Sequence, residues 1–438
     1  MTPSERQVTL ACKLSPTLQG ISQQSETSAP VANGSGEDFS IPRKKRRQLW
    51  RYPLVVFITF VLLVWADGLL VRLPRLAGTP ARGERVGVIH VHTAASCGSG
   101  SLPEVIATAK QADLSFVAIT DHNLALSDEE VAAADPPEFA VIDGEEVSTA
   151  SGHFLALGVS GNRWDRGTSY DTRSLMHSTR QAGAVNFIAH PYGLRDRWLD
   201  WGAEEYDGIE IFNDDAVWRK NTVLDIAIAA LLYPVNSRLA LLRLARTPTE
   251  NFAKWDQLLD QRPVAGICGS DAHANVIVNR MSVAKFPSYL SVFSLARQHV
   301  LLPEQSGVDP DHAGADAILA AIKAGNSFCA IDTLYPAGGF VQTISSSSKV
   351  VGPGNTIEWQ EGEVLHIRVP AGADDPMIRV LKDGHEIAKQ ETHSLDISVT
   401  GPGRYRAEAY LRQPGLTGWR RWTLWVFANP VRVSGPRS

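Results

Sequence analysis

The chain has 438 residues, of which 44% are hydrophobic and 20% charged, and its formal net charge is −5. This length suits two or three domains, and the composition is that of a globular protein. The acidic balance gives no reason to expect a nucleic-acid partner, because nucleic-acid binding usually needs a basic face. The four cysteines form no CxxC pair, and we expect no disulfide framework in a chain long enough to build its own core. Cys268 lies in an apolar run and is interpreted as a core residue.

The N-terminal region combines a polar tail with one apolar segment. We expect residues 1–52 to be a disordered, basic tail, since they cannot bury enough apolar surface to offset chain entropy. The run RKKRR at 43–47 precedes the apolar run 53–71, which as a helix would span roughly 28 Å. We predict a transmembrane signal anchor over 53–72 that contacts the lipid bilayer; a cleaved signal peptide is the alternative. The basic run favours a cytoplasmic N-terminus, with the remainder of the chain periplasmic or extracellular.

From residue 84 the chain alternates β-branched runs with helix-like segments. The predicted strands lie at 86–92, 114–122, 138–146, 153–159, 184–190, 207–213 and 264–273. Helical stretches are expected between several of them, for example at 102–113 and 171–183. This alternation predicts parallel strands with helical crossovers, and therefore an α/β barrel or sheet over 84–335.

Histidines and carboxylates gather where these strands end. His90 and His92 close the first predicted strand, and Asp271 and His273 close the last. Side chains at positions i and i+2 of a strand share a face, so each pair can point to the same side. The C-terminal ends of parallel barrel strands meet at one mouth, where sites form. His153 differs because it opens its strand.

Eight residues make up the predicted metal-ligand set. A single strand-end histidine is usually only a satisfied polar residue, but six of the twelve histidines fall in this pattern. Imidazole and carboxylate are the groups that Zn²⁺, Mn²⁺ or Fe²⁺ require. Because eight ligands exceed the needs of one ion, we expect two or three divalent ions. The set is His90, His92, His122, Glu146, His153, His190, Asp271 and His273.

The same residues, in this order, resemble the polymerase-and-histidinol-phosphatase (PHP) superfamily of metal-dependent hydrolases. The matching motifs are HVHTAAS (90–96), ITDHN (119–123), DGEEVST (143–149), GHFLALG (152–158), AHP (189–191), DGIEIFN (207–213) and GSDAH (269–273). The resemblance covers roughly residues 86–280 and implies a distorted seven-stranded α/β barrel with metals at its mouth. Within the superfamily, the residues of several motifs and the appended C-terminal region look closest to the carbaryl-hydrolase-like branch.

The resemblance also implies how the ligands divide. It implies one ion bound by His90, His92, Glu146 and Asp271, a second by Glu146, His153 and His190, and a third by His122 and His273. Glu146 would bridge two ions, and Glu146, His190 and Asp271 are also counted as catalytic residues. The family usually has Asp or His at the position of Cys97. A thiolate there would favour zinc over manganese, while a small buried thiol without a ligand role is the alternative.

Further candidates surround the predicted metals. Asp121 is expected to orient the neighbouring His122 as a supporting partner. Arg195, Asn213 and Arg280 are candidate substrate contacts from loops at the barrel mouth.

The residues after the barrel have a different character. Strand-like runs separated by Gly, Pro and Asp turns predict a β-sandwich over 336–438. For the whole chain we predict a membrane-anchored hydrolase that acts through metal-activated hydroxide on a small phosphoester (an EC 3.1 activity). Alternatives are a carboxylic ester or carbamate hydrolase with the same metals, and an inactive binding protein.

Overall fold

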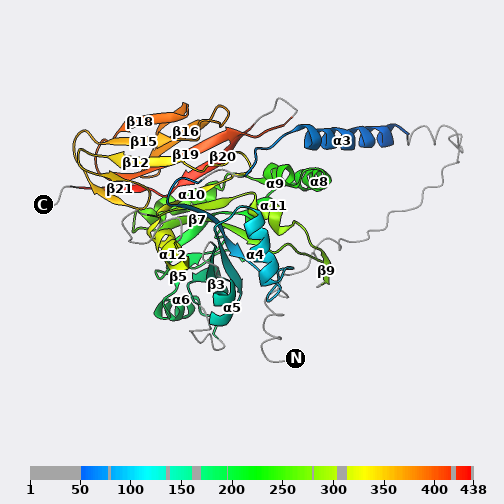
Figure 1. Ribbon diagram of the computed structural model, residues 1–438, viewed down its shortest axis with the longest axis horizontal. Coiled ribbons are helices and arrows are strands. Elements are labelled where there is room, and N and C mark those ends of the chain that lie inside the picture. Colours follow the sequence, from blue (N-terminus) through cyan, green and yellow to red (C-terminus); the bar gives the residue numbers. More distant parts are fainter. Residues whose placement is uncertain are drawn as a thin grey trace, which may run out of the picture.

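The computed structural model describes residues 51–76, 80–134, 139–159, 169–194, 196–278, 281–302, 313–415 and 421–435 (Figure 1). The predicted tail 1–52 therefore lies almost wholly outside the described residues. So do Arg195 and Arg280, and the roles predicted for them stay predictions.

The centre of the fold is a closed barrel of seven strands. In sheet order each strand pairs with the next, and β1 pairs with β7 to close the ring. Each of the seven predicted strands overlaps one of these. The strands are β1 (Glu84–Val91), β2 (Phe116–His122), β3 (Ala140–Thr149), β4 (Gly152–Leu157), β5 (Val185–Ile188), β6 (Gly208–Asn213) and β7 (Ala265–Ala272).

One barrel strand runs against the others, contrary to the expectation of parallel strands throughout. β4 pairs antiparallel with both β3 and β5, whereas the other barrel pairs are parallel. The cause is the connection: only Ala150 and Ser151 separate β3 from β4, which allows a hairpin but is too short for a parallel crossover. The reversal explains why His153 opens its strand, because the start of β4 lies beside the C-terminal ends of its neighbours.

Helices occupy most of the crossovers. They are α4 (Leu102–Gln111), α5 (Asp128–Ala134), α6 (Thr172–Gln181), α7 (Asp214–Arg219), α10 (Thr249–Leu259), α11 (Tyr289–Phe293) and α12 (Ala315–Ala324). Their ends follow local rules. Ser101 and Glu104 form a capping box at the start of α4, and Gly325 ends α12 with φ of 75°, a backbone conformation that glycine adopts without strain.

The barrel sheet continues into the C-terminal region. The first half of β1 pairs with β10 (Arg297–Leu301), which pairs with β11 (Ser327–Ala330) and then β20 (Trp422–Ala428). Beyond β20 the sheet contains β19 (Gly403–Arg412), β21 (Val431–Ser434) and β14 (Thr356–Glu358), with β16 (Met377–Lys382) and β17 (His385–Glu391) as a branch. The antiparallel pair β8 (Val276–Val278) and β9 (Met281–Ala284) stands apart.

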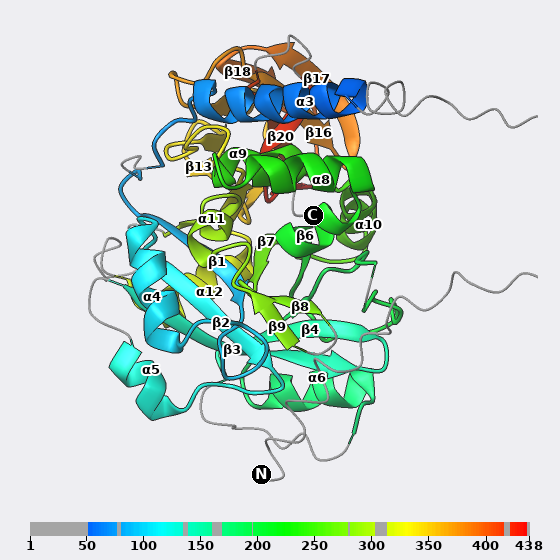
Figure 2. The same ribbon diagram turned by 90° about the vertical axis from the view of Figure 1, so that its right-hand side faces the viewer.

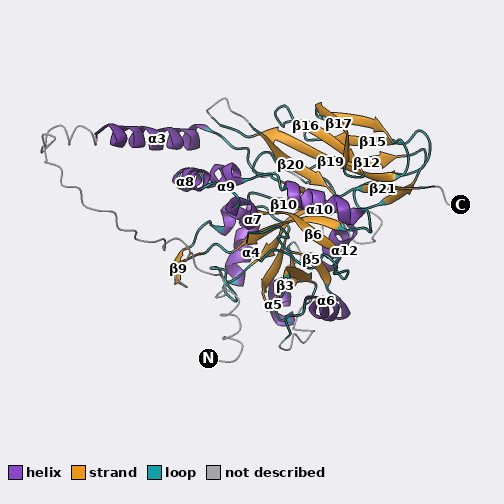
Figure 3. Cartoon of the chain, turned by 180° about the vertical axis from the view of Figure 1, so that it is seen from behind, coloured by secondary structure: helices purple, strands orange, loops and turns teal. Residues whose placement is uncertain are grey.

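A second sheet covers this C-terminal extension. It contains β12 (Val341–Ser345), β13 (Val350–Val351), β15 (Val364–Arg368) and β18 (Ser394–Ser398). Ile344 and Leu365 from this sheet share one buried cluster with Ile378 and Ala407 from the other. All described elements after α12 are strands (Figure 3). Two sheets with a common apolar core are what a β-sandwich requires.

Two disulfide partners join the barrel to this extension. Cys268 on β7 is bonded to Cys329 on β11, so the expectation of a plain core residue is corrected. Sequence spacing gave no sign of the bond, because 61 residues separate the two cysteines. Both lie in the interior, where the strands of the barrel and of the extension come together.

A buried charged triad lies on the other side of the same junction. His299 on β10 is held between Glu84 Oε1, at 2.6 Å from Nδ1, and Asp332 Oδ2, at 3.1 Å from Nε2. Burial alone would lower the pKa of His299, but the two carboxylates outweigh burial and raise that pKa to about 9. The triad therefore ties β1, β10 and the segment after β11 together through a charged imidazole.

Helix α3 (Arg51–Leu70) is long and apolar enough to cross a membrane. It ends two residues before the predicted boundary at 72. Below it in Figure 2 lie α8 (Val223–Leu232) and α9 (Ser237–Leu244), and Pro234 lies in the turn between these two helices. Arg243 on α9 bonds Asp67 on α3 with an N–O distance of 2.6 Å, so the helix is tied to the body at its C-terminal end.

Candidate metal centre

Glu146 lies at the centre of the site, on β3, with 1% of its side chain exposed. Five imidazoles converge on its two carboxylate oxygens. Oε1 lies 2.8 Å from His153 Nδ1 and 2.9 Å from His190 Nε2. Oε2 lies 3.1 Å from His122 Nδ1, 3.3 Å from His90 Nε2 and 3.3 Å from His92 Nε2.

Asp271 closes the other side of the group from β7. Its Oδ1 lies 3.5 Å from His90 Nε2, 3.4 Å from His92 Nε2 and 3.4 Å from His273 Nδ1. The His273 ring stacks on that of His92 with centroids 4.2 Å apart. All eight predicted ligands therefore lie in one cluster, on strands that are far apart along the chain.

Buried atoms in this cluster test whether metal ions fit. Within the described chain, a set of ring nitrogens and carboxylate oxygens is buried without any hydrogen-bond partner. They are His90 Nε2, both ring nitrogens of His92, His122 Nδ1, Glu146 Oε2 and Asp271 Oδ1. An unsatisfied buried polar atom costs about 1–3 kcal/mol, so six in one place are costly unless they have a ligand. Cations satisfy both kinds of atom, and the donor set therefore fits divalent ions.

The ligand atoms form four overlapping groups, each with atoms within 4.8 Å of one another. The groups are His90, His92 and Asp271; His90, Glu146 and His190; His122, Glu146 and His153; and His92, Cys97, His122 and His273. The first and last agree with two of the sites that the resemblance implied. His153 is grouped with His122 here, although its Nδ1 and His190 Nε2 also share Glu146 Oε1.

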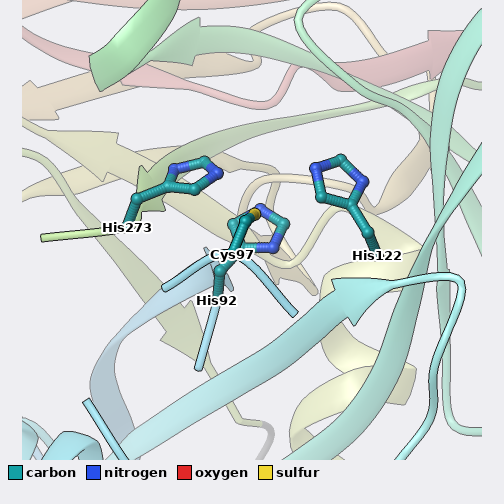
Figure 4. A group of neighbouring side chains, drawn as sticks. All are labelled: His92, Cys97, His122 and His273. Carbon is teal, nitrogen blue, oxygen red and sulfur yellow. The ribbon is translucent and has the colours of Figure 1, made fainter. Parts of the chain in front are cut away.

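Cys97 belongs to the fourth group, shown in Figure 4. It is buried, in the loop after β1, and its sulfur lies among the rings of His92, His122 and His273. Sulfur and imidazole together are ligands that favour zinc. The geometry is thus open to a third ion at the position where the sequence departs from the family pattern.

Three of the ligands adopt unusual backbone conformations. His90, His190 and Asp271 have positive φ values of 67°, 27° and 48°, which are uncommon for residues other than glycine. The pairing of β1 shifts register between Val88 and Val91. The alternation of side chains along a strand therefore does not by itself account for the directions of the His90 and His92 side chains, because this irregularity turns the side chain of His90. Strain of this kind concentrates at functional sites.

Glu210 supports the site and was missed in the sequence. It lies on β6, fully buried, and its Oε1 is 2.7 Å from His90 Nδ1. Its Oε2 accepts the backbone N–H of His190 at 2.6 Å and the side-chain amide of Asn213 at 2.9 Å. Glu210 therefore directs Nε2 of His90 toward the cluster. The motif DGIEIFN contains the only signal, a carboxylate within an otherwise apolar strand.

The structure shows which groups Asp121 and Asn213 contact. Asp121 accepts hydrogen bonds from the backbone and hydroxyl of Thr93, at 2.8 and 2.6 Å, and from the hydroxyl of Ser96. These bonds fix the loop that carries Cys97, and the role of Asp121 in orienting His122 stays a prediction. Asn213 caps α7 by accepting the N–H of Ala216 at 2.8 Å and is 1% exposed, and its role as a substrate contact stays a prediction.

The electrostatics of the cluster are strongly perturbed. Burial opposes the charge of His90, but Asp271, Glu210 and Glu146 outweigh it and raise the pKa of His90 well above its usual value. Burial together with the neighbouring imidazoles lowers the pKa of His122. The burial of Glu146 is outweighed by the surrounding imidazoles, which lower the pKa of its carboxyl. The carboxylate oxygens are therefore anionic, whereas the raised pKa of His90 means that a cation binding at this ring must displace its proton.

A pocket leads outward from His190. Its lining includes Tyr192, Asn213, Lys220, Arg246 and Thr249. Lys220 Nζ lies 2.7 Å from Glu250 Oε2, and Arg246 Nη2 lies 3.1 Å from Asp225 Oδ2. Glu250 lines the same pocket, so both cations have a carboxylate partner here.

Comparisons with known proteins add little to this picture. No protein-family model and no curated protein matches the chain. Among solved structures, the chain is similar to a two-domain protein from Bacteroides vulgatus that contains a predicted PHP-like metal-dependent phosphoesterase. The identity is 13%, 81% of this chain and 98% of that chain are covered, and the TM-score is 0.37. A second is an amidohydrolase from Chromobacterium violaceum with bound sulfate, with 16% identity, 42% and 87% coverage and a TM-score of 0.28.

Proposed function

We propose that this chain is a membrane-anchored hydrolase of the PHP superfamily that uses two or three divalent ions (zinc, manganese or iron) to cleave phosphoesters, an EC 3.1 activity. The observation that supports this most strongly is the set of six buried ligand atoms without hydrogen-bond partners around Glu146. A binding protein that had lost its activity would have no need to keep all eight ligands in one cluster. Glu146, His190 and Asp271 are proposed as catalytic as well as ligating.

In this proposal, the ligand cluster, Glu210 and the cations of the pocket each have a separate role. Divalent ions held by the cluster would supply Lewis acidity toward the substrate oxygen and make a water molecule acidic enough to react near neutral pH. Glu210 keeps His90 in the tautomer whose Nε2 faces the cluster. Lys220 and Arg246 hold the anionic substrate in the pocket next to His190, so that the bond to be cut lies at the ligand cluster.

The charged groups of the pocket bear on which kind of substrate bond is cut. Lys220 and Arg246 would favour a phosphoester over a neutral ester by exchanging their carboxylate partners, Glu250 and Asp225, for the substrate. The carbaryl-hydrolase-like wording of the motifs supports a carboxylic ester or carbamate instead, which the same donor set would serve. Turnover of one substrate class over the other distinguishes these two alternatives.

The proposed location is outside the cytoplasm, with the N-terminus cytoplasmic. The basic run 43–47 immediately before α3 favours this orientation. The bond between Cys268 and Cys329 agrees with it, because disulfides persist in oxidising compartments and are rare in the cytosol.

A double substitution tests the hydrolase proposal. His90→Ala/His92→Ala removes two ligands from the cluster and should abolish turnover of bis(p-nitrophenyl) phosphate. The matched control is His177→Ala/His385→Ala, which removes two exposed histidines outside the cluster and should keep wild-type activity. Circular dichroism checks that both variants fold. Undiminished turnover in the His90/His92 variant would place the chemistry elsewhere.

A further inference from the structure

Helix α8 exposes apolar surface without a described partner for it. Its sequence is VLDIAIAALL, and Val223 and Leu224 at its start are 85% and 65% exposed. Leu232 at the other end is buried, so the large exposed apolar side chains of α8 lie at its start. Isolated apolar residues on a surface are ordinary, but an exposed apolar helix end beside a membrane-spanning candidate is not.

The helix lies directly beside α3. A Cβ at Gly68 would come within 2.8 Å of Leu232 and 2.9 Å of Val235, so Gly68 allows the two helices to touch. The indole N–H of Trp65 donates to the carbonyl oxygen of Leu231 at 3.1 Å. Figures 1 and 2 both show α8 alongside α3. The two helices are therefore joined at the C-terminal end of α3, and a bilayer that surrounds α3 comes close to α8.

The start of α8 also borders the pocket of the metal centre. Lys220, three residues before Val223, lines that pocket, as does Arg246. Arg246 binds Asn221 Oδ1 at 2.8 Å and Asp225 Oδ2 at 3.1 Å, on either side of the N-cap residue Thr222. The two cationic residues of the pocket are therefore held next to the apolar start of α8.

We propose that α8 is a second membrane contact, which inserts Val223 and Leu224 into the outer surface of the bilayer and presents the pocket to phosphoesters carried by lipids. This rests on the proposed function and deepens it by naming the substrate class. The apolar end of α8 enters the interface, as amphipathic helices do, while Lys220 and Arg246 stay at headgroup level, where basic side chains bind anionic lipids. The substrate is then drawn from the bilayer rather than from solution.

A fluorescence experiment on the full chain tests the contact independently of activity. Val223→Cys is placed in a Cys12→Ser background, labelled with an environment-sensitive fluorophore and reconstituted into phosphatidylcholine–phosphatidylglycerol vesicles. Val350→Cys is the matched control, because Val350 is also an exposed valine, at 65%, on β13. Insertion to a depth of roughly 5–10 Å should make nitroxide-labelled lipids quench the label at 223 at least about twofold more than at 350. Equal quenching overturns the proposal, as does a blue-shifted label that lipids do not quench, which would indicate a protein partner.

An activity comparison tests the substrate class. Val223→Asp/Leu224→Asp should lower turnover of a phosphoester lipid in vesicles by at least about tenfold, since charges resist transfer into the interface. Turnover of a water-soluble phosphoester by the same variant should be unchanged. Equal loss or equal retention on both substrates overturns the lipid assignment. If the wild-type chain cleaves neither substrate with metal supplied, the hydrolase proposal fails, while the quenching experiment still decides whether α8 contacts the membrane.

Discussion

Glu210 provides a sharp test of the site because it is not itself a proposed ligand. Glu210→Gln keeps the shape of the side chain but removes the charge that faces His90 Nδ1 at 2.7 Å and the backbone N–H of His190 at 2.6 Å. Removal of such an outer partner typically lowers metal affinity about 10–100-fold, which corresponds to roughly 1.4–2.7 kcal/mol. We expect a value toward the upper end, because Glu210 is completely buried and supports two ligands at once.

Competition with a chromophoric chelator measures this affinity for zinc and for manganese. The matched control is Glu145→Gln, which changes a buried glutamate on β3 whose side chain points to the face opposite that of Glu146 and should leave affinity within about twofold of wild type. Equal affinities for wild type and Glu210→Gln would refute the view that Glu210 orients the ligands.

Three further predictions concern residues around the centre. Cys97→Ser should remove the near-ultraviolet sulfur-to-metal charge-transfer band of the cobalt-substituted protein, because serine supplies no thiolate. His299 has a folded pKa of about 9, above its unfolded value of about 6.5. The charged imidazole therefore contributes its full stabilisation below pH 6.5, and this stabilisation is lost as the pH rises through 9. His299→Gln should cost about 3 kcal/mol of unfolding free energy at pH 6 and little at pH 10. Cys329→Ser breaks a bond across 61 residues and should destabilise the fold by on the order of 4 kcal/mol.

Each of these has a contrary outcome. A cobalt spectrum unchanged by Cys97→Ser would remove the thiol from the third site. A stability deficit of His299→Gln that is the same at both pH values would show that the imidazole is not charged in the folded protein. Unfolding of the Cys329→Ser variant at the same denaturant concentration as oxidised wild type would show that the disulfide does not constrain the chain.

The barrel was predictable because its signals are local. Each strand is a short run rich in β-branched and other apolar residues, and every predicted run overlaps a strand of the closed ring. The proximity of the eight candidate ligands was predictable for a related reason, since strand ends of a barrel meet at one mouth wherever they lie in the chain. The antiparallel direction of β4 was implicit in the short gap before His153 but was not inferred.

What the sequence did not reveal depends on contacts between distant segments. Cys268 and Cys329 are paired only because β7 and β11 come together in the fold. Glu210 looks like an ordinary polar residue in a strand until His90 and Gly269 are placed next to it; a Cβ at Gly269 would collide with its carboxylate. The partner of Asp121 likewise depends on the path of the loop after β1, which no pattern of residue types specifies.

Metal content is the most direct test of the central claim that this cluster binds several ions. The full chain, purified in detergent without chelators and supplied with zinc or manganese, is measured by inductively coupled plasma mass spectrometry alongside Glu146→Gln. Because Glu146 contacts five of the imidazoles, we predict at least two ions per wild-type chain and a loss of at least one in the variant. Less than one ion per wild-type chain, or equal contents in the two proteins, would contradict the account.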